Sequence, residues 1–426
     1  MNLKNNYNIL IYSILYISLL CGFFLNEDLT IGYKIDHFIH IKIIEQFNEN
    51  FTQTLLSFDR QDLGFTTSHS PFFYIFYLII KKISLDNDLI LRIINLHISI
   101  FIPYLFYLIL KTKNLNNKNP LIVLIPGIFF LSPNFRSGSL WIGSENISIV
   151  FLFASFYYYL LFKGSINKNF AFIILHVIFL SIAAYFRPIY SLFSLFFFIS
   201  LVRDLIITKK ILYYIIINLF LAFPAFYYLF ILKINFIAMH IVGEPASISR
   251  FTNQFSLVIS ILFFYSTSFI LFNFKHLIKT FFSTTNLVLF CIYIFILINY
   301  FDYEASYGGG IFYRISTLFL SNNSFFYFIS GLGFIFFKII LIDNFKFKKN
   351  INDIILILTL IFLELDVTIY HETYDVIIYP LFLIFFKNYF FSNFLQNFNR
   401  KKLLFLYFFS FMFLLMNLIK KIILII

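Results

Sequence analysis

The chain is divided into a series of long apolar runs, each bounded by charged or polar residues. Runs such as 90–110, 211–232 and 280–300 are long enough to cross the hydrocarbon layer of a membrane, about 30 Å thick, as helices. A backbone that crosses lipid must satisfy its own hydrogen bonds, and a helix does so within one segment. The runs therefore predict an all-α, polytopic integral membrane protein of roughly 12–13 transmembrane helices.

The composition of the chain supports this class. Hydrophobic residues make up 61% of the sequence and charged residues 12%, whereas soluble domains carry about 25% charged residues. The net charge is +12, but the Lys and Arg residues occur in short loops between apolar runs. Membrane orientation explains this placement, because basic residues are retained on the cytoplasmic side. We therefore expect a lipid bilayer as a partner and no nucleic acid, since no basic stripe is long enough to follow a phosphate backbone.

The basic clusters also predict the orientation of the chain. When they are laid alternately across a membrane, most fall on one side, the cytoplasm: Lys4; Lys163 and Lys168; Arg203, Lys209 and Lys210; Lys275 and Lys279; Lys346 to Lys349; Arg400 to Lys402. The alternation fails near 81–82 and 111–118, because one of the short runs 71–80 and 120–132 is not a full crossing. The sequence does not say which. Residues 1–426 are predicted to form a single transmembrane domain.

The longest connection, residues 26–70, is predicted to be the first extracytoplasmic loop. It is acidic, in contrast to the chain as a whole, and loops of this length are usually functional. Its middle part places Ile35, Phe38, Ile39, Ile43 and Phe47 at helical spacing, with the polar side chains elsewhere. This pattern predicts an amphipathic helix on the outer membrane surface.

The run 169–202 is too long for one crossing and contains the pair Arg187-Pro188. A proline inside a helix removes a backbone hydrogen bond, so we expect two spans joined by a tight turn at this pair. Arg187 would then lie on the outer side. It would either bind a phosphate with its planar guanidinium or extend to the membrane surface without a ligand. The same alternatives apply to Arg314.

The outer loops collect carboxylates together with the imidazoles of His40 and His69. A carboxylate can accept the proton of an attacking hydroxyl, and a cation can stabilise a departing phosphate. Water-facing loops are polar without any catalytic role as well, so the residues alone leave both interpretations open. No cofactor is expected. A divalent metal is an alternative for the acidic late loop, whose candidate ligands are Glu364, Asp366, His371, Glu372 and Asp375.

Five short motifs favour a catalytic role. In chain order they are DHFIHIKIIE (36–45), SHSPFFYIFYLI (68–79), RIINLHISIFIPYLFYLILK (92–111), SENISIVFLF (144–153) and HETYDVIIYPLF (371–382). Their order resembles that of the C-type (GT-C) membrane glycosyltransferase superfamily, nearest in layout to the transferases that use dolichyl- or polyprenyl-phosphate sugars. The resemblance implies a GT-C-like fold with a long first outer loop.

The resemblance also implies roles for individual residues. Asp36 matches the catalytic carboxylate of the first loop, and His40 matches the His or Tyr that follows it. His69 and Glu145 belong to motifs that would support the site, and Asp28 is a rival for the catalytic role. The phosphate would be bound by one of the two arginines named above. The chain departs from the family at His37, where many relatives have Glu.

The expected function is transfer of a sugar from a polyprenyl-phosphate-sugar donor to a glycan, lipid or protein acceptor, with inversion at the sugar carbon. The active site would lie on the extracytoplasmic face of a cell membrane, the bacterial inner membrane or the endoplasmic reticulum. Two alternatives remain open. One is a lipid-linked polysaccharide polymerase or ligase, which would carry its large loop late in the chain. The other is a transporter or flippase, which would show an inverted repeat.

Overall fold

A computed structural model of the chain describes residues 3–30, 32–58, 69–113, 119–165, 169–205, 209–234, 247–272, 274–304, 308–343, 347–364 and 368–425. Every secondary-structure element in these ranges is helical, which confirms the all-α prediction. The chain forms two compact units. Unit 1 comprises Met1–Ser194, Leu201–Met239 and Phe398–Ile426, and unit 2 comprises Leu195–Ser200 and His240–Asn397. The single transmembrane domain stays a prediction.

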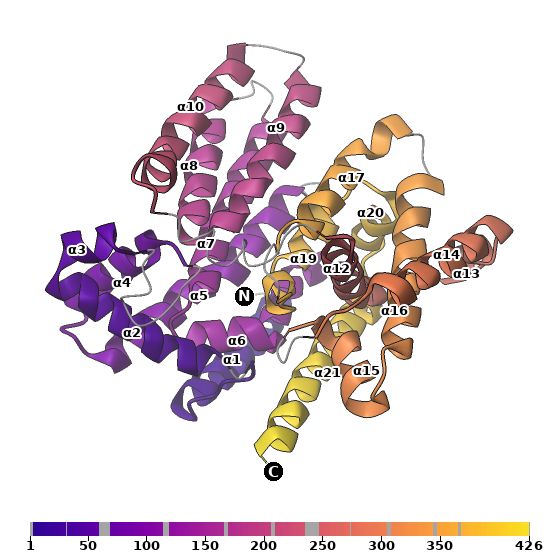
Figure 1. Ribbon diagram of the computed structural model, residues 1–426, viewed down its shortest axis with the longest axis horizontal. Coiled ribbons are helices and arrows are strands. Elements are labelled where there is room, and N and C mark those ends of the chain that lie inside the picture. Colours follow the sequence, from indigo (N-terminus) through magenta and orange to yellow (C-terminus); the bar gives the residue numbers. More distant parts are fainter. Residues whose placement is uncertain are drawn as a thin grey trace. The chain divides into compact units, whose positions relative to one another are not determined.

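Unit 1 contains the helices of the first half of the chain and the last helix (Figure 1). They are α1 (Leu3–Phe24), α2 (Tyr33–Glu49), α3 (Phe51–Leu56), α4 (Pro71–Ile83), α5 (Asp88–Lys113), η2 (Pro120–Leu131), α6 (Pro133–Leu140), α7 (Ser144–Gly164), α8 (Phe170–Phe186), η3 (Pro188–Ser191), α10 (Lys209–Phe226), η4 (Tyr227–Ile231) and α21 (Arg400–Ile425). The middle of α9 (Leu192–Leu205) belongs to unit 2, and its two ends belong to unit 1.

Unit 2 contains the remaining described helices. They are α12 (Ile248–Ile270), α13 (Phe274–Phe281), α14 (Thr284–Tyr300), α15 (Gly310–Leu320), α16 (Ser324–Lys338), η5 (Ile339–Asp343), α17 (Phe347–Ile361), α18 (Glu372–Asp375), α19 (Ile378–Pro380), η6 (Leu381–Phe385) and α20 (Tyr389–Gln396). Helix α12 packs against α14, α15, α16 and α17 and is the centre of this unit.

Six of the described helices are long and apolar enough to cross a membrane, and a seventh span results if the bent pair η2 and α6 is counted as one. Six shorter apolar helices of 10–17 residues accompany them. The structure thus supports a multi-pass membrane protein, while the count of 12–13 spans stays a prediction. Helix α8 ends at Phe186 and a new helical turn begins at Pro188, as the proline predicts.

Many helix starts follow from local sequence. Ser70 caps α4 by accepting a hydrogen bond from the backbone N–H of Phe72, and Pro71 occupies the first helical position. At the start of α6, Ser132 accepts a hydrogen bond from the backbone N–H of Phe135, and Pro133 occupies the first helical position. A hydroxyl at the cap satisfies a backbone donor that the helix cannot, and proline is tolerated in the first turn because its missing N–H would have no partner there.

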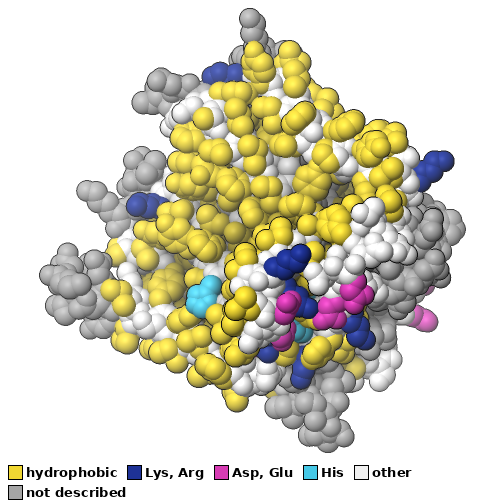
Figure 2. Space-filling model, turned by 90° about the vertical axis from the view of Figure 1, so that its left-hand side faces the viewer, with side chains coloured by type: hydrophobic (Ala, Val, Ile, Leu, Met, Phe, Trp, Pro, Cys, Tyr) yellow, Lys and Arg dark blue, Asp and Glu magenta, His cyan; other side chains and the backbone are white. Residues whose placement is uncertain are grey.

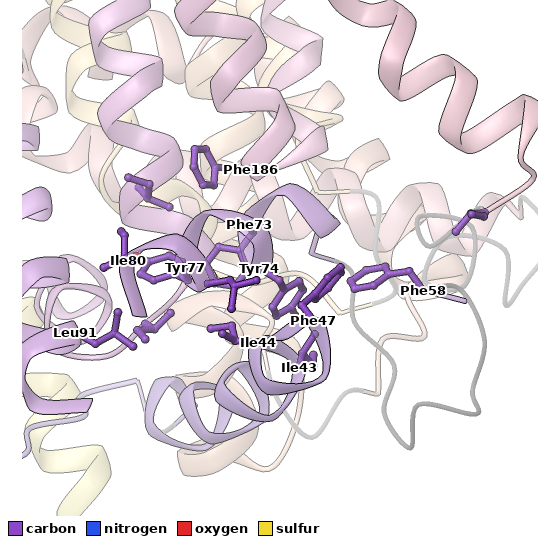
Figure 3. Close-up of a cluster of buried hydrophobic side chains, with 14 residues drawn as sticks. Ile43, Ile44, Phe47, Phe58, Phe73, Tyr74, Tyr77, Ile80, Leu91 and Phe186 are labelled. Atoms are coloured by element: carbon purple, nitrogen blue, oxygen red, sulfur yellow. The ribbon is translucent and has the colours of Figure 1, made fainter. Parts of the chain in front are cut away.

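Helices α2 and α4 are joined by a buried hydrophobic cluster (Figure 3). Phe47 of α2 stacks on Tyr74 of α4, with ring centroids 6.2 Å apart. The polar contacts run along both helices. The Tyr74 hydroxyl lies 3.2 Å from Nδ1 of His40 near the start of α4, and Lys81 Nζ lies 3.0 Å from Glu45 Oε1 near its end. Helix α4 therefore lies alongside α2.

Helix α4 is also short. Its 13 residues span about 20 Å, which is less than the hydrocarbon thickness of a membrane. The length of α4 favours 71–80 as the run that does not cross, and this topology stays a prediction. The run 120–132 continues through the 67° bend between η2 and α6, and this pair forms either one broken span or a re-entrant loop.

A buried ion pair fixes the end of α1 to α6. Arg136 Nε and Nη2 lie 2.6 and 2.7 Å from the two carboxylate oxygens of Glu27. Arg136 Nη1 also donates to the hydroxyl of Ser18, and the indole N–H of Trp141 donates to the backbone carbonyl of Glu27. Bidentate pairs of this kind have a defined geometry, so they hold the segment that leads from α1 to α2.

The outer surface of the described chain is largely apolar. On the face shown in Figure 2, hydrophobic side chains cover most of the described surface, and the acidic side chains lie in its lower part together with some of the basic ones. Helix α10 illustrates this, since Leu219 and Phe220 are both exposed. An apolar surface of this extent suits a lipid environment.

Candidate functional site

The predicted site residues of unit 1 gather at one end of its long helices. Glu145 lies in the first turn of α7, whereas Lys163 lies in its last turn. Helix α8 packs along α7 in the opposite direction. Arg187 directly follows Phe186, the last residue of α8. The salt bridge between Glu145 and Arg187 shows that the two ends meet. Helix α2 contributes Asp36 and His40.

Asp36 lies in the first turn of α2, and its side chain is exposed. His40 follows four residues later on the same face of the helix. Nearby protein atoms that exclude water, the charge of Glu145 and the charge of Asp28 together raise the pKa of Asp36 to about 6. A carboxylate with this pKa is a better proton acceptor than an ordinary aspartate, and it is still ionised at neutral pH.

The Asp36 carboxylate is accessible. Among the described residues, no hydrogen bond and no ion pair engages its oxygens. Its charged neighbours are the carboxylates of Glu145 and Asp28. A carboxylate with a structural role is normally bound to a cation or to backbone N–H groups. Asp36 therefore has the features of a functional group.

The imidazoles of His40 and His69 pack against each other. Their ring centroids are 4.9 Å apart in an edge-on arrangement. His40 is buried, and this burial together with the neighbouring imidazoles of His69 and His37 holds the pKa of His40 well below its usual value. His69 contacts the Ser144 hydroxyl through Nδ1 at 3.0 Å. A neutral His40 is suited to hydrogen bonding and packing and not to carrying charge.

Glu145 and Arg187 form the charged part of the site. Arg187 Nη2 lies 3.5 Å from Glu145 Oε1, and the two side chains are 15% and 14% exposed. The backbone at Gly143 allows Glu145 to approach α2. A Cβ atom at Gly143 would lie 2.8 Å from Cε1 of Tyr33 and 2.9 Å from Oε2 of Glu145. The absence of a side chain there brings α2 and the start of α7 together.

Asp28, the rival catalytic residue, has a structural role. Its side chain is buried, and it accepts hydrogen bonds from the backbone N–H of Lys34 at 3.1 Å and from the hydroxyl of Thr30 at 3.3 Å. These bonds shape the segment that enters α2. The Asp28 carboxylate is thus engaged by a backbone N–H and a hydroxyl, whereas that of Asp36 is not engaged by any described residue.

The amphipathic pattern expected for α2 differs in detail from the structure. The helix forms where it was predicted, and Ile43 and Phe47 are buried, but Ile35 and Phe38 are exposed. His37 and His40, placed on the polar side by sequence, are both buried. The reason is that each imidazole finds a polar partner. His37 Nε2 lies 3.1 Å from Asp88 Oδ1, and His40 contacts Tyr74 as described above.

Arg314 and the late acidic loop, residues 364–375, belong to unit 2. Arg314 Nε donates to the carbonyl of Gly308 at 2.7 Å, the first of three glycines that all have positive φ. The hydroxyl of Tyr265 donates to Asp375 Oδ1 at 2.9 Å and lies 2.8 Å from Nε2 of His371. Thr373 donates to the carboxylate of Glu364.

The metal alternative falls on the same loop of unit 2. One of its candidate ligands, Asp366, lies outside the described residues. Within the part of the chain that the structure describes, no group of three or more His, Cys, Asp or Glu side chains is arranged to hold a metal ion.

Sequence reasoning missed three residues of the unit 1 site. Tyr33 and Gly143 place Glu145 against α2, and Tyr190 lies beside Arg187, Glu145 and Ser148. Only Tyr190 had a usable signal, since it follows Arg187 by one helical turn. The chain matches no protein-family model, and comparison with curated proteins and with solved structures found no match. Its function is therefore argued from the site.

Proposed function

We propose that the chain is a membrane glycosyltransferase that transfers a sugar from a polyprenyl-phosphate donor to an acceptor hydroxyl on the extracytoplasmic face. The observation that carries the proposal is Asp36, an accessible carboxylate with a pKa of about 6 and no hydrogen-bonding partner among the described residues. It lies close to Glu145, which is paired with Arg187. The reaction requires a proton acceptor and a cation that stabilises the departing phosphate.

The reaction needs one proton acceptor and one stabilised leaving group. Asp36 accepts the proton of the acceptor hydroxyl while that oxygen forms a bond to C1 of the sugar. The bond between C1 and the phosphate oxygen breaks at the same carbon, on the opposite side, and the polyprenyl phosphate departs with the electron pair. The sugar is transferred with inversion, and the proton resides on Asp36 until solvent removes it.

Arg187 is the cation suited to the departing phosphate. Its guanidinium is planar and always charged, and it can donate two parallel hydrogen bonds to a phosphate. It directly follows α8 and precedes Pro188, so it lies at the end of an apolar helix, where a lipid-linked phosphate would meet the protein.

The test is a transfer assay with the whole chain. Membranes that contain the protein, and control membranes from cells that lack it, receive a polyprenyl-phosphate sugar labelled in the sugar. The proposal predicts that label appears in a new glycan, glycolipid or glycoprotein only where the protein is present, and that a nucleotide sugar given in the absence of polyprenyl phosphate does not replace the donor.

The alternatives give different results in the same assay. A lipid-linked polysaccharide polymerase or ligase would move label only as a preassembled oligosaccharide. A transporter or flippase would leave the donor intact and move it between the two leaflets. Either of these results, with no new bond to the single sugar, would contradict the proposal.

A further inference from the structure

Tyr190 brings a buried hydroxyl to the Glu145 and Arg187 pair. The backbone N–H of Tyr190 donates to the carbonyl of Arg187 at 3.0 Å, which places the phenol one turn after the guanidinium. Tyr190 is 0% exposed, and its hydroxyl faces Arg187, Glu145 and Ser148. No described atom meets hydrogen-bond geometry with that hydroxyl. Ser148 instead donates to the carbonyl of Glu145 at 2.7 Å.

A buried hydroxyl without a hydrogen bond is unfavourable, because folding has removed it from water without replacing the bonds it made there. Such groups in native structures call for an explanation. One explanation is a ligand that completes the hydrogen bond. Because the neighbouring Arg187 is positively charged, this ligand would be an anion. An oxyanion accepts from both a phenol and a guanidinium.

The ion pair between Glu145 and Arg187 is long enough for another anion to replace the Glu145 carboxylate. The 3.5 Å between Arg187 Nη2 and Glu145 Oε1 exceeds the 2.7–2.9 Å typical of a charge-assisted hydrogen bond. Both side chains keep some exposed surface, 15% for Arg187 and 14% for Glu145. Tyr190 itself has no exposed surface.

We propose that Arg187 and Tyr190 form a phosphate subsite. In the empty protein the Glu145 carboxylate pairs with Arg187, and the phosphate of a lipid-linked substrate displaces that carboxylate. The proposal rests on the proposed function for the identity of the lipid, but the chemistry it assigns is that of a phosphate monoester or diester. Glu145 is then a positioning residue that keeps the empty guanidinium paired. Tyr190 is a binding residue that contacts the phosphate only in the occupied state.

The experiment measures binding without turnover. The full chain, in nanodiscs of a neutral phospholipid, is titrated with radiolabelled polyprenyl phosphate that carries no sugar. Tyr190→Phe should raise Kd by about tenfold or more, as expected for loss of a hydrogen bond to a charged group. Its melting temperature should stay unchanged or rise, because the hydroxyl has no bond to lose in the empty protein. A purely structural tyrosine would lose stability instead.

Two further variants sharpen the test. Glu145→Gln should lower Kd by about two- to fivefold, because it removes the competitor from a partly exposed ion pair. Tyr185→Phe is the matched control, since the hydroxyl of Tyr185 donates to the carbonyl of Leu221 at 2.5 Å. It should leave Kd at the wild-type value.

Competitors identify the source of the phosphate. Polyprenol, which has the chain and no phosphate, should not displace the label. Displacement by phosphatidic acid as effective as by polyprenyl phosphate would extend the subsite to any lipid phosphate, and displacement by inorganic phosphate would extend it to soluble anions. A wild-type Kd in Tyr190→Phe, or displacement by polyprenol, would overturn the subsite.

The subsite and the proposed function fail in different ways. If polyprenyl phosphate binds in a manner that depends on Tyr190 but no sugar is transferred, the transferase is wrong and the subsite stands. If sugar is transferred in a manner that depends on Asp36 but Tyr190→Phe binds and transfers normally, the subsite is wrong and the transferase stands.

Discussion

Glu145 at the start of α7 and Arg187 after the end of α8 lie 3.5 Å apart through Oε1 and Nη2, and this contact defines the candidate site. It requires that α7 and α8 run in opposite directions with a short connection at their far end, where Lys163 lies. The same end of unit 1 holds Asp36, whose pKa is raised partly by the charge of Glu145.

Gly143→Ala should disturb the site without replacing any of its charged groups. The added Cβ would lie 2.8 Å from the Tyr33 ring and 2.9 Å from the Glu145 carboxylate, so one of them must move. We expect a loss of about 1–3 kcal/mol of stability and reduced sugar transfer. Thermal unfolding and the transfer assay provide the readouts. Gly164→Ala is the control, since no atom lies within 4 Å of its added Cβ. Equal effects of the two variants would contradict the packing described.

Glu27→Gln should destabilise the protein strongly. The Arg136 side chain is 5% exposed and that of Glu27 18%, so the substitution leaves a buried guanidinium without its counter-charge, at a cost of about 3–5 kcal/mol. Glu45→Gln is the comparison. It breaks the ion pair between Glu45 and Lys81, in which the Glu45 side chain is 52% exposed. That loss should stay within about 1 kcal/mol. Thermal unfolding in detergent compares the two. A mild effect of Glu27→Gln would show that the pair is hydrated.

The placement of α4 alongside α2 predicts the sidedness of the loop that follows it. In a background with Cys21→Ala and Cys291→Ala, an impermeant thiol reagent on intact cells should label Asn50→Cys and Asp86→Cys. It should label Ser165→Cys, after the basic end of α7, only once the membrane is permeabilised. Labelling of Asp86→Cys on the inner side would mean that α4 crosses the membrane.

The sequence predicted the helical class and several local features well, because each depends on short-range patterns. The break at Arg187-Pro188 follows from proline chemistry, and the helix around Asp36 follows from apolar spacing. The burial of His37 was not predictable. It depends on a contact with Asp88, a residue far away in the sequence, and periodicity carries no information on such partners.

In the candidate site, too, short-range motifs predicted some features, and contacts between distant residues determined the others. Asp36, His40, His69, Glu145 and Arg187 were named from motifs and predicted sidedness, and the structure brings all five to one end of unit 1. Asp28 could not be separated from Asp36 by sequence, since both are acidic residues of the first loop. Only the hydrogen bonds that engage the Asp28 carboxylate distinguish them.

The pH dependence of transfer should report on Asp36. A proton acceptor with a pKa of about 6 is ionised at neutral pH, so the rate should fall as the pH drops through about 6. Stability should behave oppositely. A carboxyl group whose folded-state pKa is raised stabilises the fold when protonated, and this contribution is lost as the pH rises through about 6. Above that pH, Asp36→Asn should therefore melt at a higher temperature than the wild type. An acidic limb near pH 4 would contradict the account.

The most direct test of the central claim is the rate of sugar transfer by Asp36→Asn. The substitution keeps the shape of the side chain and removes its capacity to accept a proton. The rate of transfer from labelled polyprenyl-phosphate sugar in membranes should therefore fall by about 10² to 10⁴, with binding of polyprenyl phosphate retained. Asp28→Asn should have a milder effect, because that carboxylate is buried and shapes the backbone before α2. Full activity in Asp36→Asn, or a full loss confined to Asp28→Asn, would contradict the assignment of Asp36 as the proton acceptor.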